Sequence, residues 1–416
     1  MGILDFLKVK NDYDNYAISL DIGTEFVKAL IFKVEDKKAK ILGVGRQRQR
    51  LADIQGGVVS DIYGVISNCE TALDQAATQS KILPDQVVIG IAGELVKGMT
   101  TTVRYVRPDG NARITVEELK EIVAKVQKKA FEQTRKILAW ETGHREIDVR
   151  LVNAAVEDVK IDGYRVTNPL GFQGKEIEIG VFNVFAPVVH LGALQTIAES
   201  LDLDLLSIVA EPFAVARSID RSTDFSAIFI DVGGGTTDIA VVSKGGLAGT
   251  KMFAIGGRTF TKRIAGVLNE PFLEAEQDKL NYSQSKLSGE KKELIQRAVE
   301  SDTEVWFSGV ELTLSEFKNI ELLPSRVYLC GGGSNLLEIK KIMENAKWNK
   351  KLPFAKRPII GFLEPKNLAA VEDGTKELKD ASDVTPMALA NLAIDLVGEE
   401  KVVDGMLNKM ITTIKN

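Results

Sequence analysis

Apolar residues in the first part of the chain follow two periods, and each period predicts one kind of element. Continuous or alternating apolar residues predict strands, and these lie at 17–20, 26–32, 41–44, 87–91 and 99–105. Apolar residues three or four positions apart predict one helix over 65–77, through Val65, Cys69, Leu73 and Ala76. Strands and helices therefore alternate, which is the pattern of an α/β protein.

The same two periods continue in the second half of the chain. They predict helices at 191–200, from Pro212, through most of 259–317, at 335–344 and from Pro386, and strands at 205–209 and 227–244. Apolar alternation resumes at Ile239 and Val241. Residues 231–238 are therefore expected to join two strands rather than a strand and a helix.

A small α+β unit is expected within the first domain, over about 84–174. Pro84 opens it, and after two strands the turn sequence Arg107-Pro108-Asp109-Gly110 follows. Thr115 and Glu118, three positions apart, form a capping-box pattern that predicts a helix from there to about Thr134. Strands are expected around 146–155 and 177–185.

Composition limits the class of protein. A chain of 416 residues exceeds one hydrophobic core, so two or more domains are expected. The net charge of −5 argues against nucleic acid as a partner. Two cysteines (Cys69 and Cys330) fit a reducing cytoplasm, and two distant histidines (His144 and His190) make a histidine-based metal or Ser-His site improbable. Neither a run of about 18 apolar residues nor a signal-peptide core is present, so a cytoplasmic protein is expected.

Three glycine-rich turns follow apolar strands and carry the candidate chemistry. They are Asp21-Ile22-Gly23-Thr24, then Asp231-Val232-Gly233-Gly234-Gly235-Thr236-Thr237-Asp238, then Gly331-Gly332-Gly333-Ser334. Glycine lets backbone N–H groups close around an anion, and the carboxylates of Asp21 and Asp231 are suited to a divalent cation. The turns therefore predict a site for a nucleotide with Mg²⁺.

Each turn alone also has an ordinary structural explanation, as a strand end or a strand-to-helix loop. Consecutive glycines between strands weaken a sheet, however, and the third turn opens a helix whose dipole favours anions. All three in this order favour a nucleotide site over plain turns. Neither a Walker A sequence nor Gly-x-Gly-x-x-Gly is present, which excludes the P-loop and Rossmann sites.

The order of these turns resembles the superfamily of actin, sugar kinases and heat-shock-chaperone ATPases, whose two phosphate loops and adenosine loop they match. Glu211-Pro212-Phe213-Ala214-Val215-Ala216 and the segment from Pro386 to Ala393 resemble its two interdomain helices. Ala275-Glu276-Gln277-Asp278-Lys279 resembles the helix that reaches the ribose and base. The resemblance implies two ribonuclease-H-like domains around a nucleotide cleft, with an inserted α+β subdomain.

The resemblance also assigns roles to individual residues. ATP and Mg²⁺ are the implied cofactors, with Asp21 and Asp231 at the metal and Glu211 orienting the attacking water; a helix-start residue before Pro212 is the equally weighted alternative for Glu211. The residues implied in binding the nucleotide are Asp21, Gly23, Thr24, Asp231, Gly233, Gly234, Gly235, Thr236, Gly257, Glu276, Lys279, Gly331, Gly332, Gly333 and Ser334.

Within the superfamily the chain resembles the bacterial cell-division FtsA family. The inserted unit lies where that family carries its own insert, and 56–61 and 168–174 resemble short FtsA motifs. Residues 256–265 resemble a third, with Arg263 where Asp is usual. The segment after Lys279 is shorter than the FtsZ-binding subdomain of FtsA, which puts FtsZ binding in question. The pilus-assembly actin PilM, which shares the insert and has a comparably small segment there, is the alternative.

Two terminal segments are candidates for membrane contact. Val403, Met406, Leu407, Met410, Ile411 and Ile414 form one apolar helical face, for which packing against the body is the equal alternative. Residues 3–10 form a second, shorter amphipathic segment. The expected location is therefore the cytoplasm, with contact to the inner face of the cell membrane left open.

The sequence thus predicts an ATP-binding adaptor or filament of the FtsA type that acts in cell division. Its expected partners are further copies of itself and division or envelope proteins, FtsZ among them. A PilM-like scaffold and a small-molecule kinase are the alternatives, and a chaperone ATPase is disfavoured because no substrate-binding domain follows residue 400. Hydrolysis of ATP is left open. The expected division of the chain is 14–83, 175–210 (first domain), 84–174 (insert), 211–258, 323–385 (second domain), 259–322 (helical subdomain) and 386–416 (interdomain and C-terminal helices).

Overall fold

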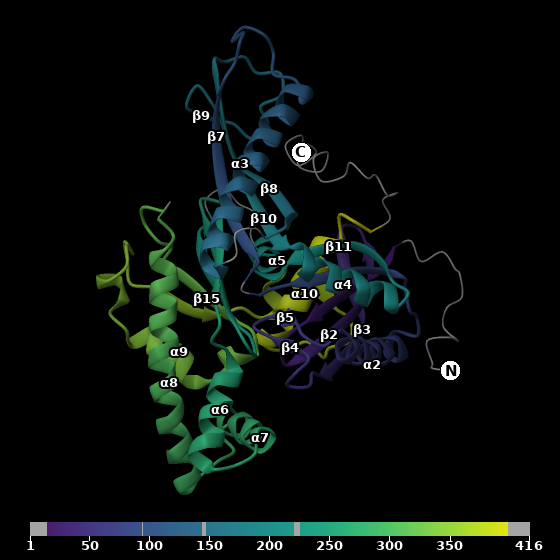
Figure 1. Ribbon diagram of the computed structural model, residues 1–416, viewed down its shortest axis with the longest axis vertical. Helices are drawn as coiled ribbons and strands as arrows, with labels where there is room; N and C mark the ends of the chain where they lie inside the picture. Colours follow the sequence, from purple (N-terminus) through teal and green to yellow (C-terminus); the bar gives the residue numbers. More distant parts are fainter. Residues whose placement is uncertain (1–14, 94, 144–146, 220–224, 319, 398–416) are drawn as a thin grey trace.

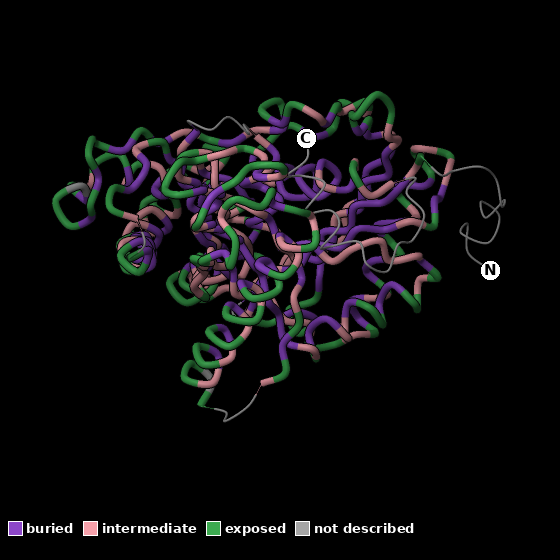
Figure 2. Tube along the Cα trace, turned by 90° about the horizontal axis from the view of Figure 1, so that it is seen from above, coloured by how far each residue is buried: buried purple, intermediate pink, exposed green. Residues whose placement is uncertain are grey.

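The computed structural model describes residues 15–93, 95–143, 147–219, 225–318 and 320–397. Two β-sheets organise this part of the chain, and a tall inserted unit rises above them at the top of Figure 1. Seen from above, buried residues run through the strands and exposed ones lie on outer helix faces and loops (Figure 2).

The first sheet has the strand order β11-β6-β1-β2-β3-β17. Its strands are β1 (Tyr16–Ile22), β2 (Phe26–Glu35), β3 (Lys38–Arg48), β6 (Gln86–Ile91), β11 (Asp204–Ala210) and β17 (Val371–Asp373). Three of them form an antiparallel meander, β1-β2-β3, while β6 and β11 run parallel to β1. This is the expected α/β arrangement of the first domain.

Helices cover both faces of this sheet. Helix α2 (Ile62–Ser80) lies so close to β3 that a Cβ on Gly45 would come 1.7 Å from the carbonyl oxygen of Ala72. On the other face lies α10 (Val384–Ala393), where the Ser19 hydroxyl donates to the Pro386 carbonyl at 2.9 Å. Glycine in β3 is therefore required by close helix packing rather than by chain flexibility.

The second sheet has the order β16-β15-β12-β13-β14-β7-β10-β8-β9. Its domain strands are β12 (Ala227–Val232), β13 (Thr237–Ser243), β14 (Gly246–Phe253), β15 (Arg326–Cys330) and β16 (Ile359–Phe362). Helices α6 (Gly257–Leu268), α7 (Phe272–Ser283), α8 (Gly289–Ser315) and α9 (Leu337–Asn345) belong to the same domain and lie at the lower left of Figure 1. As expected, 231–238 joins two antiparallel strands.

The inserted unit extends the second sheet, although in the sequence it lies between β6 and β11, which are strands of the first domain. It contains β7 (Lys97–Val106), α3 (Val116–Thr142), β8 (Val149–Ile161), β9 (Tyr164–Arg165) and β10 (Glu176–Pro187). Strand β7 pairs with β14 of the second domain through Gly98–Thr250 and Met99–Gly249. The insert is thus joined to both domains.

The boundaries of the insert differ from those expected. Residues 86–91, expected inside the unit, form the parallel strand β6 of the first sheet, because Val87, Val88 and Ile89 are fully buried beside β1. At the other end, β10 extends the unit to Pro187 by pairing with both β7 and β8. The structure therefore gives an insert of 97–187 in place of 84–174.

Within the insert, the capping residue at Thr115 is confirmed, because its side chain accepts from the Glu118 N–H. The Glu118 carboxylate, however, binds Arg107 at 2.7 and 2.9 Å. The helix also runs past Thr134 to Thr142, since Leu138 adds a further buried contact with Phe185 of β10.

The remaining elements connect these units. They are the hairpin β4 (Ile54–Gln55) with β5 (Val58–Val59), α4 (Val188–Ser200), α5 (Glu211–Arg217), and the short helices η1 (Gly332–Asn335), η2 (Trp348–Lys350), η3 (Pro365–Asn367) and η4 (Ala381–Asp383). Within the described ranges, no helix is long and apolar enough to cross a membrane. Both segments proposed for membrane contact, 3–10 and 403–414, lie outside the described residues.

Candidate nucleotide site

The first two glycine-rich turns touch each other across the boundary between the domains. Each closes a hairpin: the Gly23 N–H donates to the Phe26 carbonyl at 3.1 Å, and the Gly233 N–H to the Thr236 carbonyl at 2.9 Å. A Cβ on Gly235 would lie 3.0 Å from the Thr24 side chain, and one on Gly234 would lie 3.0 Å from the Cβ of Glu25. Small residues are therefore needed where the turns meet.

The third turn closes on the same place from the end of β15. Gly331 has a φ of +80°, and a Cβ there would lie 2.0 Å from Oδ1 of Asp231. A Cβ on Gly333 would lie 2.6 Å from Cγ1 of Val232. The Ser334 hydroxyl donates to the Gly331 carbonyl at 2.6 Å and fixes the turn before η1 and α9. All three turns thus meet around Asp231, as the sequence predicts.

Four carboxylates lie together beneath these turns, Asp21 buried and the other three half-buried: Asp21, Glu211, Asp231 and Asp238. The pKa of Asp21 is raised to about 6. Burial is the main cause; the charge of Asp231 acts in the same direction, and the charge of Lys28 acts against it. Burial and the neighbouring Asp231 raise the pKa of Asp238 to about 7. Burial also raises the pKa values of Asp231 and Glu211, the latter with help from the three aspartates. We call these four side chains the acidic cluster.

Among the residues that the structure describes, one lysine and a few hydrogen bonds act on this negative charge. Hydroxyls of Thr385 and Thr236 donate to Asp231 (2.6 Å) and Asp238 (3.1 Å). Lys28 is the cation that lowers the pKa values of Asp21, Asp231 and Glu211. Within the described ranges, no group of three or more His, Cys, Asp or Glu residues is arranged to hold a metal by itself. The donor set fits Mg²⁺ that completes its shell with phosphate and water oxygens.

Glu211 stands between the two roles considered for it. It is the first residue of α5, which has Pro212 in its first turn, so its place is also that of a helix-start residue. Its side chain nevertheless turns into the acidic cluster: a Cβ on Gly90 would lie 2.8 Å from Oε1, and Asp21 contributes to its raised pKa. The geometry is compatible with orienting a water near the phosphates.

A second group of buried polar side chains, Thr261, Glu276 and Lys279, lies around the start of α6. The Lys279 ammonium donates to the Gly257 carbonyl (3.1 Å) and the Thr261 hydroxyl (2.9 Å), and pairs with Glu276 (2.7 Å). The Thr261 hydroxyl also binds Glu276. We call this group the lysine cluster. Through the bond from Lys279 to the Gly257 carbonyl, the cluster brings together the three residues named by the resemblance, Gly257, Glu276 and Lys279.

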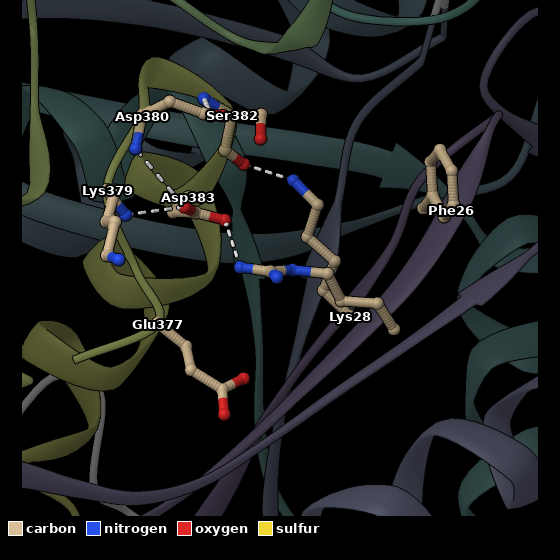
Figure 3. Close-up of a pocket in the computed structure, with 8 residues that line it drawn as sticks. Phe26, Lys28, Glu377, Lys379, Asp380, Ser382 and Asp383 are labelled. Carbon is tan, nitrogen blue, oxygen red and sulfur yellow. Dashed lines mark hydrogen bonds and ion pairs between the residues drawn. The ribbon is translucent and has the colours of Figure 1, made fainter. Parts of the chain in front are cut away.

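Several residues of this region were missed by sequence reasoning. Lys28 of β2 binds the Ser382 carbonyl and lines a cavity of about 380 Å³ with Arg46, Lys379 and Asp383 (Figure 3). A lysine within an apolar strand was a usable signal for it, and Asp238 stood inside the quoted second turn. Thr385 gave no signal, because only the fold brings α10 beneath Asp231.

Arg263, which departs from the FtsA motif, lies outside both clusters. Its guanidinium pairs with Asp302 of α8 at 2.8 Å and Nε donates to the same carboxylate at 2.9 Å. The arginine that replaces the usual aspartate at this position therefore joins α6 to α8 within the second domain, and it leaves the acidic cluster unaffected.

Comparison with known proteins relates this chain to FtsA proteins. The family model "Cell division protein FtsA" matches residues 228–381, which include the second and third turns and the lysine cluster. Cell division protein FtsA of Pseudomonas aeruginosa is 24% identical over 77% of this chain and 78% of its own length. FtsA of Enterococcus hirae is 27% identical over 64% of this chain, but the match spans 57% of that protein.

A solved structure matches over a longer span. The chain from the "PilM-PilN type IV pilus biogenesis complex" aligns with a TM-score of 0.59 and 18% identity, covering 92% of this chain and 99% of that one. The actin-like fold expected from the sequence is thus confirmed, and so is the resemblance to FtsA proteins.

Proposed function

We propose that this chain is an actin-like cell-division protein of the FtsA type that binds ATP with Mg²⁺ between its two domains. The observation that carries the proposal is the acidic cluster beneath three glycine-rich turns. Buried carboxylates with raised pKa values are costly unless a cation joins them. Magnesium bound to phosphates would supply that charge, and the likeness to FtsA proteins makes cell division the fitting setting.

In this proposal each turn has its own part. The first and second turns contribute Gly23, Thr24, Gly233, Gly234, Gly235 and Thr236 to the phosphates, and Asp21 and Asp231 hold the metal. Gly257, Glu276, Lys279 and the third turn (Gly331, Gly332, Gly333 and Ser334) serve the nucleoside. Lys28 is added as a phosphate ligand, since its ammonium binds the Ser382 carbonyl at the cavity and its charge lowers the pKa values of Asp21, Asp231 and Glu211.

Calorimetry with ATP tests this assignment. Asp231→Ala should abolish Mg²⁺-dependent ATP binding, while Lys341→Ala, an exposed change on α9, should leave it intact. Unchanged affinity in Asp231→Ala would refute the site.

Glu211→Ala separates the two roles of that residue: turnover should fall while ATP still binds, and intact turnover would leave Glu211 as a helix-start residue.

Self-association through the insert is part of the same proposal. Head-to-tail contacts that repeat without closing give filaments, and the insert projects far from both domain cores (Figure 1). Removing 97–187, rather than 84–174, keeps β6 in the first sheet, and Lys97 faces Phe185 across the β7–β10 pair, so the cut ends lie close together. ATP-dependent pelleting should be lost, and ordered filaments of the shortened chain would exclude the insert as the contact.

A second candidate is a PilM-like scaffold for pilus or envelope assembly, in which the insert docks a partner peptide. The observation that favours it is the alignment over 99% of the chain from the PilM-PilN complex. Binding to FtsZ and to liposomes tells the two apart. Co-sedimentation with FtsZ supports the FtsA type, and co-sedimentation with liposomes supports an adaptor at the inner face of the membrane. If ATP binds but the chain does not co-sediment with FtsZ, the result supports the scaffold.

A further inference from the structure

Arg258 occupies a position where a positive charge is unfavourable by itself. It is the second residue of α6, in the first turn of the helix, where the backbone dipole repels cations. That first turn contains no acidic residue to offset the charge. The sequence of α6 therefore gives Arg258 no local partner, and its partner lies in the other domain.

Within the described residues, the hydrogen-bond partners of the Arg258 guanidinium belong to the first domain. Its Nε donates to Oε2 of Glu25 at 2.7 Å, and Nη2 donates to the Thr24 carbonyl at 2.6 Å. Its Nη1 reaches the carbonyls of Leu51 and Ile54 at 3.3 and 3.4 Å. We call the Glu25–Arg258 contact the interdomain ion pair.

Glu25 is a fixed acceptor rather than a mobile surface residue. Its other oxygen accepts from Nε of Arg48, in β3 of the same domain, at 2.8 Å. The side chains of Glu25 and Arg258 are only 16% and 11% exposed. Partial burial shields the pair from salt and gives it more strength than an exposed pair.

The backbone of Arg258 ties the same residue to the second phosphate turn. Its N–H donates to the Gly234 carbonyl at 2.7 Å, and the neighbouring Gly257 N–H donates to Gly233 at 2.8 Å. One residue thus holds Gly234 with its backbone and Thr24 and Glu25 with its side chain. The two turns can separate only if the guanidinium gives up its bonds to the first domain.

We propose that the interdomain ion pair holds the two phosphate turns together and sets the rate at which a bound nucleotide leaves. Arg258 is a positioning residue in this scheme, because it acts through the turns and needs no contact with the nucleotide. Its effect on release rests on the proposed ATP binding, while its effect on domain closure does not.

A matched control lies on the same helix. Arg263 also pairs with a carboxylate at 2.8 Å, but its partner, Asp302, belongs to the second domain. Arg263→Gln removes an arginine ion pair from α6 without touching the first domain. Any difference between Arg258→Gln and Arg263→Gln therefore reports on contact between the domains rather than on loss of charge from the helix.

Domain closure is measured with spin labels at Ser67 of α2 and Gln277 of α7, two exposed positions in different domains, in the full chain without nucleotide. Arg258→Gln should broaden the distance distribution toward longer values, and Arg263→Gln should not. Distributions that coincide for both variants would overturn the proposal, whatever the protein binds.

Release is then measured by chasing a ribose-labelled fluorescent ATP with excess ATP. Hydrogen bonds to charged groups are stronger than those between neutral groups, so Arg258→Gln should release the probe about tenfold faster or more. Glu25→Gln should also speed release, and the double variant should be no faster than Arg258→Gln. Independent, multiplicative effects would contradict a paired action. A wild-type protein that fails to bind the probe would refute ATP binding, and the label distances would still decide the ion pair.

Discussion

The acidic cluster and the lysine cluster differ most in how their charges are balanced. Asp21 is 6% exposed in the first and its three companions are half-buried, while Glu276 and Lys279 are 6% and 8% exposed in the second. The lysine cluster pairs one carboxylate with one ammonium and satisfies both with Thr261. The acidic cluster holds four carboxylates near one lysine. Half of the candidate site is therefore complete by itself, and the other half is built for an added cation.

This difference predicts that mutations in the two clusters change the free energy of unfolding in opposite directions. Removing charge from the acidic cluster should stabilise the nucleotide-free protein, since it relieves desolvation and repulsion. Removing charge from the lysine cluster should destabilise it, because a partner is left buried alone.

Lys279→Met is expected to have the largest effect. Glu276 would then keep only the Thr261 hydroxyl as its hydrogen-bond donor among the contacts described above, and a buried pair that loses one partner costs about 3 kcal/mol. Thermal unfolding of the nucleotide-free protein checks this as a fall in Tm of several degrees. Lys291→Met is the control: that lysine binds Glu270 and Asp278 at the surface, where pairs contribute less than about 1 kcal/mol. Equal losses in the two variants would remove the distinction between the clusters.

Asp238→Asn should act in the opposite direction and depend on pH. Burial and Asp231 raise the pKa of Asp238 to about 7, well above the usual value for the unfolded chain. Between about pH 4 and pH 7 the unfolded chain gives up a proton that the folded protein keeps, so wild-type stability falls over that range. Asparagine removes this loss and still accepts the hydrogen bond from Thr236.

The gain in stability from Asp238→Asn should therefore grow from pH 4 to pH 7 and stay constant above it, at about 1–2 kcal/mol. Denaturant unfolding at several pH values measures it. Saturating Mg²⁺ and ATP should reduce the gain, because the wild-type carboxylate then has a cation nearby. A gain that is independent of pH would show that Asp238 is ionised in the folded protein without cost.

Sequence reasoning found the turns because their local chemistry is visible in short motifs, and it found Glu276 and Lys279 through the resemblance to a family motif, without Thr261. Apolar alternation at Ile239 and Val241 predicted the strand pairing at 231–238, and the order of the three glycine-containing turns predicted one shared site. The inserted unit was misplaced at both ends because β6 and β10 are both apolar runs, and only sheet pairing assigns β6 to the first sheet. Glu25 and Arg258 are 233 positions apart, and no local pattern links a glutamate in a turn to an arginine at a helix start.

Glu276→Gln should have the smallest effect and gives the sharpest test of the comparison. Glutamine keeps an acceptor for Thr261 and Lys279 but removes the negative charge, so the hydrogen bonds persist and the ion pair is lost. The loss should be about 1 kcal/mol, well below that of Lys279→Met, because the Lys279 ammonium keeps the Gly257 carbonyl and the Thr261 hydroxyl as acceptors, whereas the Glu276 carboxylate in Lys279→Met keeps a single donor. The double variant with Lys279→Met should recover part of the Lys279→Met loss, since no unpaired charge remains. Additive losses in the double variant would show that Glu276 and Lys279 act separately, and the lysine cluster would then be two contacts rather than one balanced pair.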